Sequence, residues 1–380
     1  MRSLSSSAGV PNSIIGRLYE VNWLLFALVY VLGAIGVVMI FAATEGEWNQ
    51  GAFQHLTRLL VAGVIMITVA LIDIRVWYHS AYPIYTVALI LLAAVDFFGV
   101  SVNGSQRWLD LSIIRLQPSE IMKVGIVLAL ARYYHDLPGR NVSSPSGLLG
   151  ALLLIGLPMQ FILRQPDLGT TILLIMTGLT LIFLAGVRWR VIGGAVIAAM
   201  VMIPLFFKYG LKDYQRSRIQ TLLSPESDPT GASYHIIQSK IALGSGGVSG
   251  KGYMQGTQRQ GEYVPENTTD FIFTVIGEEF GLIGCVMTIA LYSALLALCI
   301  FLSTQTKHAF SRLMILGIST TFALYIFINM GMVMGLIPVV GVPLPLISYG
   351  GTVILVVMIG FGLILSANLY RQTELPRGGN

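Results

Sequence analysis

The chain has 380 residues, of which 55% are hydrophobic and only 11% are charged, and its mean hydropathy is +0.76. Soluble domains carry about 25% charged residues, so this composition excludes a soluble globular protein and indicates an integral membrane protein. The net charge of +5 is compatible with anionic lipid headgroups, and no basic cluster interleaved with aromatic residues points to nucleic acid. Two cysteines are too few for a disulfide framework or a cysteine-based zinc site.

The hydropathy pattern predicts about ten membrane-spanning helices, because each span needs about 20 mainly apolar residues. The first 20 residues are polar, and the apolar run after them has no small-residue cleavage site, so we interpret it as a retained first span. The expected spans cover residues 22–43, 58–73, 82–98, 118–133, 147–163, 169–186, 190–207, 271–303, 311–336 and 350–369. We therefore expect an all-α integral membrane fold.

The basic residues of the short loops predict that both termini are cytoplasmic. With the termini inside, eleven Arg or Lys residues fall on the cytoplasmic side and four on the opposite side. The cytoplasmic set is Arg2, Arg17, Arg75, Arg132, Arg140, Arg188, Arg190, Lys307, Arg312, Arg371 and Arg377, and the opposite set is Arg58, Arg107, Arg115 and Arg164. Residues 1–380 then form a single membrane domain, with one large periplasmic loop, 208–270, between the seventh and eighth spans. The eighth run is about ten residues longer than a bilayer requires, so we expect it to tilt or to project into the cytoplasm.

Ionisable residues near membrane depth are costly and mark candidate functional sites. Several of them gather where spans begin on the predicted outer face. Glu120 and Lys123 open the fourth span, Asp167 precedes the sixth, and Asp270 opens the eighth. Arg107 lies in the loop before the fourth span, so topology alone brings these charges to one face of the membrane.

Each acid also has a purely structural interpretation. Glu120 follows Pro118 in the first turn of a helix, where a carboxylate suits the helix dipole. Asp167 and Asp270 are equally compatible with helix caps. Lys123 is harder to explain in this way, because it lies within the apolar run three residues after Glu120 and on the same helix face. We expect an intramembrane ion pair between Glu120 and Lys123. The alternative to a functional role is that this pair only stabilises the fold.

The long loop is nearly neutral overall but is locally basic between Lys212 and Arg218. Basic side chains at a bilayer surface suit phosphate or pyrophosphate. Arg216, Arg218 and Lys240 are therefore candidate substrate contacts, and a merely solvated loop is the alternative.

The other polar features of the sequence do not point to a particular reaction. The glycine-rich stretch 244–252 lacks the first glycine and the Ser or Thr of a phosphate-binding loop, so a flexible turn is the better interpretation. Glu278 and Glu279 lie inside the eighth span, and at least one of them must face the bundle interior. The proline- and glycine-rich segment 331–351 predicts a broken, rigid outward loop, which is tolerated at membrane depth only against protein or a water-filled cavity. The five histidines show no metal-ligand spacing.

Six motifs resemble the SEDS family of membrane proteins, and the resemblance covers nearly the whole chain. They are Arg-Trp-Leu-Asp-Leu at 107–111, Gln-Pro-Ser-Glu at 117–120, Gln-Pro-Asp-Leu-Gly-Thr at 165–170, Tyr-His-Ile-Ile-Gln-Ser-Lys-Ile-Ala at 234–242, Pro-Glu-Asn-Thr-Thr-Asp-Phe-Ile-Phe at 265–273 and Pro-Leu-Pro-Leu-Ile-Ser-Tyr-Gly-Gly at 343–351. The short N-terminal tail and the overall length are more similar to the elongation members of the family than to the division members.

The resemblance implies a peptidoglycan glycosyltransferase that polymerises lipid II into glycan strands on the outer face of the cytoplasmic (inner) membrane. It also implies a partner, a class B penicillin-binding protein (a transpeptidase), within the rod-shape elongation complex. By the family pattern, Asp270 corresponds to the essential catalytic acid, and Glu120 and Lys123 correspond to a polar pair in the membrane cavity.

Three functions compete on the residues themselves. In an enzyme, Asp270 is the candidate general base, and either basic side chains or a divalent cation, Mg²⁺ or Mn²⁺, neutralise the pyrophosphate; the sequence does not identify metal ligands. A lipid II flippase is the alternative, since Glu120 and Lys123 suit a transport pathway. A scaffold that only recruits the transpeptidase leaves the polar residues without a purpose. The enzyme is favoured because the charges gather at the outward ends of the spans instead of continuing through the bilayer.

Overall fold

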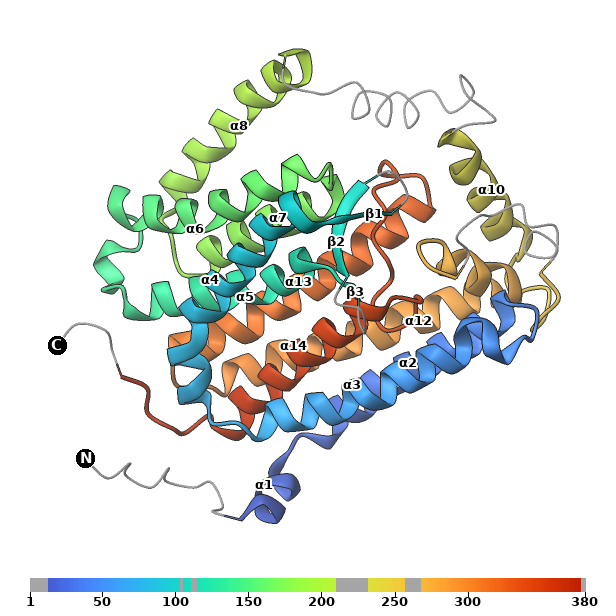
Figure 1. Cartoon of the computed structure of the whole chain (residues 1–380), viewed down its shortest axis with the longest axis horizontal. Coiled ribbons are helices and arrows are strands. Elements are labelled where there is room, and N and C mark those ends of the chain that lie inside the picture. Colours follow the sequence, from blue (N-terminus) through green and yellow to red (C-terminus); the bar gives the residue numbers. More distant parts are fainter. Residues whose placement is uncertain (1–12, 103–104, 111–114, 210–231, 257–267, 377–380) are drawn as a thin grey trace.

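A computed structural model describes residues 13–102, 105–110, 115–209, 232–256 and 268–376 of the chain (Figure 1). The α-helices are α1 (Ile14–Glu20), α2 (Trp23–Ala43), α3 (Phe53–Leu71), α4 (Ile74–Phe98), α5 (Pro118–Asp136), α6 (Pro145–Arg164), α7 (Leu168–Leu184), α8 (Trp189–Tyr209), α10 (Ala232–Ser245), α12 (Ile272–Thr304), α13 (Ala309–Val333) and α14 (Gly351–Leu369). The remaining elements are a π-helical turn η1 (Trp48–Ala52), a 3-10 turn η2 (Gly139–Asn141) and the strands β1 (Val100–Val102), β2 (Ser105–Asp110) and β3 (Arg115–Leu116).

The predicted all-α membrane fold is confirmed in its class. Each of the ten expected spans coincides with one helix among α2 to α8 and α12 to α14, and seven of these helices are long and apolar enough to cross a membrane. Two helices begin five or more residues earlier than expected, α3 at Phe53 and α4 at Ile74. For α4 the reason is a cap, because the Asp73 carboxylate accepts a hydrogen bond from the Arg75 amide at 2.8 Å.

A small antiparallel sheet, in the order β1-β2-β3, interrupts the helical pattern between α4 and α5. Val100 pairs with Trp108, and Leu109 pairs with Leu116. The sequence predicts no strands here, because such short strands leave no hydropathy signal in a chain dominated by long apolar runs. The sheet matters for function because β2 carries Arg107.

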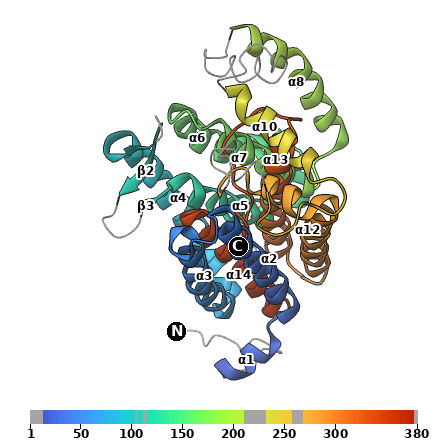
Figure 2. The same ribbon diagram turned by 90° about the vertical axis from the view of Figure 1, so that its right-hand side faces the viewer.

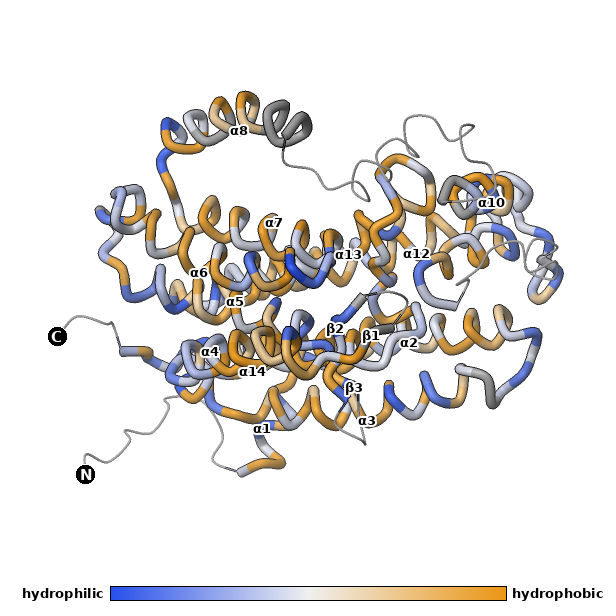
Figure 3. The backbone as a smooth tube through the Cα atoms, turned by 45° about the horizontal axis from the view of Figure 1, so that its top comes forward, coloured by the Kyte–Doolittle hydropathy of each residue, from blue (hydrophilic) through white to orange (hydrophobic). Residues whose placement is uncertain are grey.

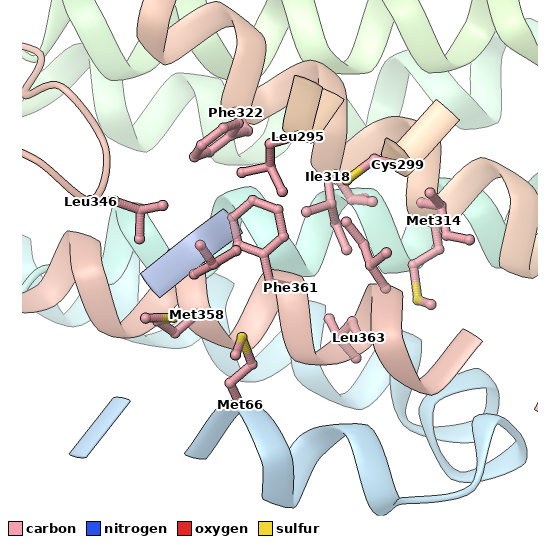
Figure 4. Close-up of a cluster of buried hydrophobic side chains, with 14 of the residues drawn as sticks. Met66, Leu295, Cys299, Met314, Ile318, Phe322, Leu346, Met358, Phe361 and Leu363 are labelled. Atoms are coloured by element: carbon pink, nitrogen blue, oxygen red, sulfur yellow. The ribbon is translucent and has the colours of Figure 1, made fainter. Parts of the chain in front are cut away.

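The centre of the bundle is α13, which packs against α5, α7, α12 and α14, while α14 also packs along α3. Figure 4 shows the apolar cluster that these helices share. Phe322 of α13 and Phe361 of α14 meet there edge to face, with 5.0 Å between their ring centroids. The outer faces of the helices stay apolar, as the exposed side chains of Val64, Leu152 and Ile283 illustrate, and this exterior suits lipid (Figure 3).

The first and last helices of the bundle meet at one end. The guanidinium of Arg17, in α1, lies 6.0 Å from the ring of Tyr370, directly after α14. Figures 1 and 2 both show α8 set apart from the other helices.

The eighth expected span is one helix with a break, not a continuous helix, and its expected tilt or projection stays a prediction. Helix α12 contains a break at Gly281, whose φ of 64° and ψ of −157° are not helical. The break shortens each straight segment, so the length of the run does not require projection beyond the bilayer. The predicted broken loop is confirmed between the end of α13 at Val333 and the start of α14 at Gly351.

We expect opposite effects from alanine at two helical glycines. A Cβ at Gly362 would lie 2.7 Å from the carbonyl oxygen of Met66 in α3, so Gly362→Ala should force α14 away from α3 and lower the thermal unfolding temperature in detergent. A Cβ at Gly156 meets nothing within 4 Å, so Gly156→Ala should raise that temperature through a helix-propensity gain of about 1 kcal/mol. Equal shifts in the two variants would contradict the close approach of α3 and α14.

Candidate active site

A polar cavity of about 490 Å³ lies where the strand hairpin, the starts of α5, α7 and α14, and the approach to α12 meet. Its charged lining residues are Arg107, Glu120, Lys123, Asp167 and Asp270. The structure therefore brings together five of the eight candidate site residues, drawn from four separate stretches of the chain.

Glu120 and Lys123 form the predicted ion pair on the first turns of α5. The Lys123 Nζ lies 2.6 Å from Glu120 Oε1, and the lysine and glutamate side chains are only 3% and 5% exposed. Tyr325 of α13 completes the group, because its hydroxyl donates to Glu120 Oε2 at 2.5 Å and also contacts Lys123 Nζ. Each ionised group is thus paired and hydrogen-bonded, which is the condition for burying charge at this depth.

Asp167 is both a helix cap and a member of the cavity lining. As the N-cap of α7 it accepts hydrogen bonds from the Thr170 amide at 3.1 Å and from the Thr170 hydroxyl at 2.9 Å. Arg107 reaches it from β2, with 3.7 Å between Nη1 and Asp167 Oδ2. Arg107 also donates to the carbonyls of Gln165 and Pro166, at 3.1 and 2.7 Å, so one guanidinium fixes the whole turn before α7.

Asp270 lies in the turn before α12, and its capping interpretation was wrong. The N-cap residue of α12 is Phe271, whose own side chain makes no cap hydrogen bond. The turn is instead held through its backbone: the Asn329 amide group donates to the carbonyl of Asp270 at 2.8 Å, and the Ser348 hydroxyl donates to that of Thr269 at 2.5 Å. The carboxylate faces Gly341, where a Cβ would lie 3.4 Å from Asp270 Oδ2.

Tyr349 joins the turn before α12 to the start of α14. Its amide donates to the Thr268 carbonyl at 2.8 Å, and its hydroxyl donates to the Gln54 side chain. The guanidinium of Arg58 stacks on the Tyr349 ring, with 4.7 Å to the centroid. A wall of the cavity next to Asp270 is thus fastened to α3.

The other candidates lie elsewhere. Lys240 is exposed on α10 and is not among the lining residues. Arg216 and Arg218 fall outside the described residues. Tyr325 and Asn329 were missed by sequence reasoning, and their spacing of four residues in an apolar run, which places both on one helix face, is the signal that could have identified them.

The donor groups in and near the cavity determine how a metal ion would be held. Within the described ranges, no three His, Cys, Asp or Glu side chains gather closely enough to hold a metal ion. Glu120 is occupied by Lys123 and Tyr325. The lining thus fits a cation that is held mainly by a bound phosphate and by one carboxylate, Asp167 or Asp270.

These features define a multi-pass α-helical membrane protein with a charged cavity at one end of its bundle. The family model described as "Cell cycle protein", that of FtsW, RodA and SpoVE, matches residues 22–373. The chain belongs to this family, and the resemblance found in the sequence motifs is confirmed.

Relatives with similar sequences cover most of the chain. It is 48% identical over 323 residues to the peptidoglycan glycosyltransferase MrdB of Escherichia coli strain K12, a match that covers 84% of this chain and 86% of the relative. It is 33% identical over 359 residues to the probable peptidoglycan glycosyltransferase FtsW of Trichlorobacter lovleyi, covering 92% and 93% of the two chains.

Solved structures share the fold. A chain from a peptidoglycan synthase complex, described as coordinating polymerization and crosslinking, matches with a TM-score of 0.79 and 28% identity, over 92% of this chain and 97% of that one. The rod shape determining protein RodA of Thermus thermophilus matches with a TM-score of 0.70 and 25% identity, over 93% and 98% of the two chains.

We expect that removing one charge of the buried Glu120–Lys123 pair destabilises the protein more than removing both charges. Lys123→Met leaves the Glu120 carboxylate buried without its cation, so unfolding should become easier by about 3 kcal/mol or more. The double variant Lys123→Met/Glu120→Gln removes both charges and should recover much of that loss. Thermal unfolding in detergent measures both, and a double variant less stable than Lys123→Met would contradict this account.

Proposed function

We propose that the chain is a glycosyltransferase that polymerises lipid II, the lipid-linked precursor of peptidoglycan, into glycan strands. The observation that carries the proposal is the cavity in which Asp270 lies with two cationic side chains, Arg107 and Lys123. The names of the relatives, peptidoglycan glycosyltransferases, support the same activity. A substrate with a lipid tail and a charged headgroup suits a charged cavity inside a membrane protein.

We propose the inner membrane as the location, with the cavity on the extracytoplasmic side. The cavity includes Gly351 at the start of α14, whereas Arg17 packs on Tyr370 after its end. These two ends are separated by 19 residues, about 28 Å at 1.5 Å per residue, which is close to the thickness of a bilayer core. The basic residues of the short loops favour the cytoplasm for the end near Arg17.

In the proposed reaction, Asp270 is the general base. Its carboxylate takes the proton from the 4-hydroxyl of the acceptor sugar. The hydroxyl oxygen then bonds to the anomeric carbon of the donor, whose bond to the lipid pyrophosphate breaks. The hydrogen bond from Asn329 to the Asp270 backbone supports this role, because a base must be held in position to act.

The leaving pyrophosphate needs positive charge. Arg107 and Lys123 line the same cavity as Asp270 and are our candidates for that charge. Arg107 already faces Asp167, and Lys123 already faces Glu120. The positive charge of each is therefore shared between that carboxylate and the substrate. Arg216 and Arg218 remain candidates from the sequence.

A divalent cation fits this demand. Asp167 or Asp270 would hold it together with the substrate phosphates, and when bound it would neutralise the charge that develops on the departing pyrophosphate. We expect chelation with EDTA to reduce polymerisation by the purified protein, and added Mg²⁺ or Mn²⁺ to restore it. Full activity with EDTA in excess would leave this task to the arginine and lysine side chains.

We propose a class B penicillin-binding protein, a transpeptidase of the elongation complex, as the partner. The support is the similarity to a chain from a synthase complex described as coordinating polymerization and crosslinking. Crosslinking requires a second activity beside glycan polymerisation, and a transpeptidase supplies it.

The decisive variant is Asp270→Asn, which keeps the size of the side chain and removes its basicity. We expect it to abolish glycan polymers when the protein, purified with its transpeptidase partner, is incubated with lipid II and the products are resolved on a gel. Glu47→Gln removes an exposed acid from the loop after α2 and should leave polymerisation unchanged.

Folding is checked by thermal unfolding of both variants. Full activity of Asp270→Asn would reject Asp270 as the base. A wild-type complex that makes no polymer, yet moves lipid II across vesicle membranes, would replace the glycosyltransferase with a flippase.

A further inference from the structure

The break in α12 interrupts the helical hydrogen bonds that span Gly281, including those expected of Leu282 and Ile283. In a continuous helix, the amides of Leu282 and Ile283 would donate to the carbonyls of Glu278 and Glu279, four residues earlier. The non-helical backbone of Gly281 separates these groups. Four backbone groups within a long apolar helix therefore need other partners.

A turn from the large loop supplies all four partners. We call residues 246–252 the glycine turn. Its amides at Lys251 and Gly252 donate to the carbonyls of Glu278 and Glu279, each at 3.0 Å. Its carbonyls at Gly247 and Val248 accept from the amides beyond the break, at 3.0 and 3.2 Å. The glycine turn thus takes the place of the missing helical turn.

Glycine is required on both sides of this junction. A Cβ at Gly250 would lie 2.1 Å from the carbonyl oxygen of Glu279, and one at Gly246 would lie 1.9 Å from that of Gly277. Gly250 and Gly281 also have positive φ angles, of 79° and 64°. The stretch that the sequence analysis interpreted as a flexible turn is a turn, but it is seated on α12.

An ion pair fastens the same junction. Lys251 Nζ lies 2.7 Å from Glu278 Oε1, with the lysine side chain 25% exposed and the carboxylate side chain only 2% exposed. A carboxylate buried to this extent requires a paired cation. The prediction that at least one of Glu278 and Glu279 faces the interior is confirmed for both, since both are buried.

The segment between the break and the cavity is short and enclosed. Residues 271–279 of the chain are all buried, and they connect Glu278 directly to the turn that carries Asp270. Eight residues separate the two acids, roughly 12 Å along a helix. Asn329 and Ser348 hold the Asp270 end of this segment, and the glycine turn holds the other end.

The glycine turn is itself anchored. It follows α10 directly, and the Ser239 hydroxyl of α10 donates to the carbonyl of Val333 at the end of α13. The support of the segment therefore runs from α13 through α10 and the glycine turn to α12.

We propose that Lys251 is a positioning residue of the transferase reaction: through Glu278 it holds residues 271–279 in place and so fixes the Asp270 carboxylate in the cavity. The proposal rests on the function proposed above for Asp270. It assigns no contact with the substrate to Lys251, and it gives the large loop a defined mechanical role next to the site.

The test compares Lys251→Met with Lys251→Arg, which keeps the charge, and with Lys307→Met, which removes a lysine from the loop before α13. Hydrogen exchange of the full-length protein in detergent is followed by mass spectrometry. We expect amides of residues 270–280 to exchange about tenfold faster in Lys251→Met, and at the wild-type rate in Lys251→Arg and Lys307→Met.

Polymerisation kinetics with lipid II give the second measurement. We expect kcat to fall about tenfold or more in Lys251→Met with KM within about twofold of wild type, because a displaced base slows the chemical step without removing substrate contacts. Lys251→Arg should restore kcat. Lys251→Met leaves the buried Glu278 carboxylate without its cation and can impair folding. The double variant Lys251→Met/Glu278→Gln removes both charges, so it is a second variant that lacks the ion pair.

Three results separate the outcomes. If residues 270–280 exchange at the wild-type rate in both Lys251→Met and Lys251→Met/Glu278→Gln, Lys251 does not hold this segment. Faster exchange with unchanged kcat overturns the positioning role. A wild-type protein that makes no polymer rejects the proposed function, and the exchange measurement then still decides whether Lys251 holds this segment.

Discussion

Hydrogen bonding of backbone groups away from water is the constraint on which this site depends. A bundle of unbroken helices satisfies it automatically but offers no concave, polar lining. Here part of the lining comes from non-helical segments, and the one before α14 is hydrogen-bonded to three helices. The Tyr292 hydroxyl donates to the Pro345 carbonyl at 2.6 Å, Asn329 donates to the Val342 carbonyl at 2.7 Å, and the His55 ring is 3.1 Å from the Leu346 carbonyl. The rigid packing of α12, α13 and α3 thus stabilises irregular backbone beside the cavity.

The charged groups of the cavity are likewise paired with side chains from other elements. Glu120 is held by Tyr325 from another helix, and Asp167 is held by Arg107 from the strand hairpin. Since each pair joins segments that are far apart in the sequence, the pairs fix how the helices meet as well as the local charge. The structure thus gives these residues a structural role, and that role is compatible with the function proposed above.

The sequence predicted the helices and most of the charged lining because both have strong local signals. An acid or a lysine in an apolar run is conspicuous, and span ends on one face bring such residues together. Gly281 and Tyr325 could not be identified in the same way. A glycine in a membrane helix is ordinary, and its break becomes visible only with the turn from residues 246–252 that replaces the lost hydrogen bonds. Asp270 resembled a cap because an acid directly before a helix is a common N-cap residue.

The depth of the polar lining bears on the choice between enzyme and transporter. Below the group of Glu120, Lys123 and Tyr325, the neighbouring cavity measures only about 30 Å³, room for very few water molecules, and its lining is mostly apolar. Phe322 and Phe361 pack edge to face in this region. A pathway for a charged headgroup needs polar partners through the bilayer, because each ionised group left unpaired in hydrocarbon is costly. In the described part of the bundle, the charged lining instead ends at the buried ion pair, so the cavity suits a headgroup held at one face, as a transferase requires.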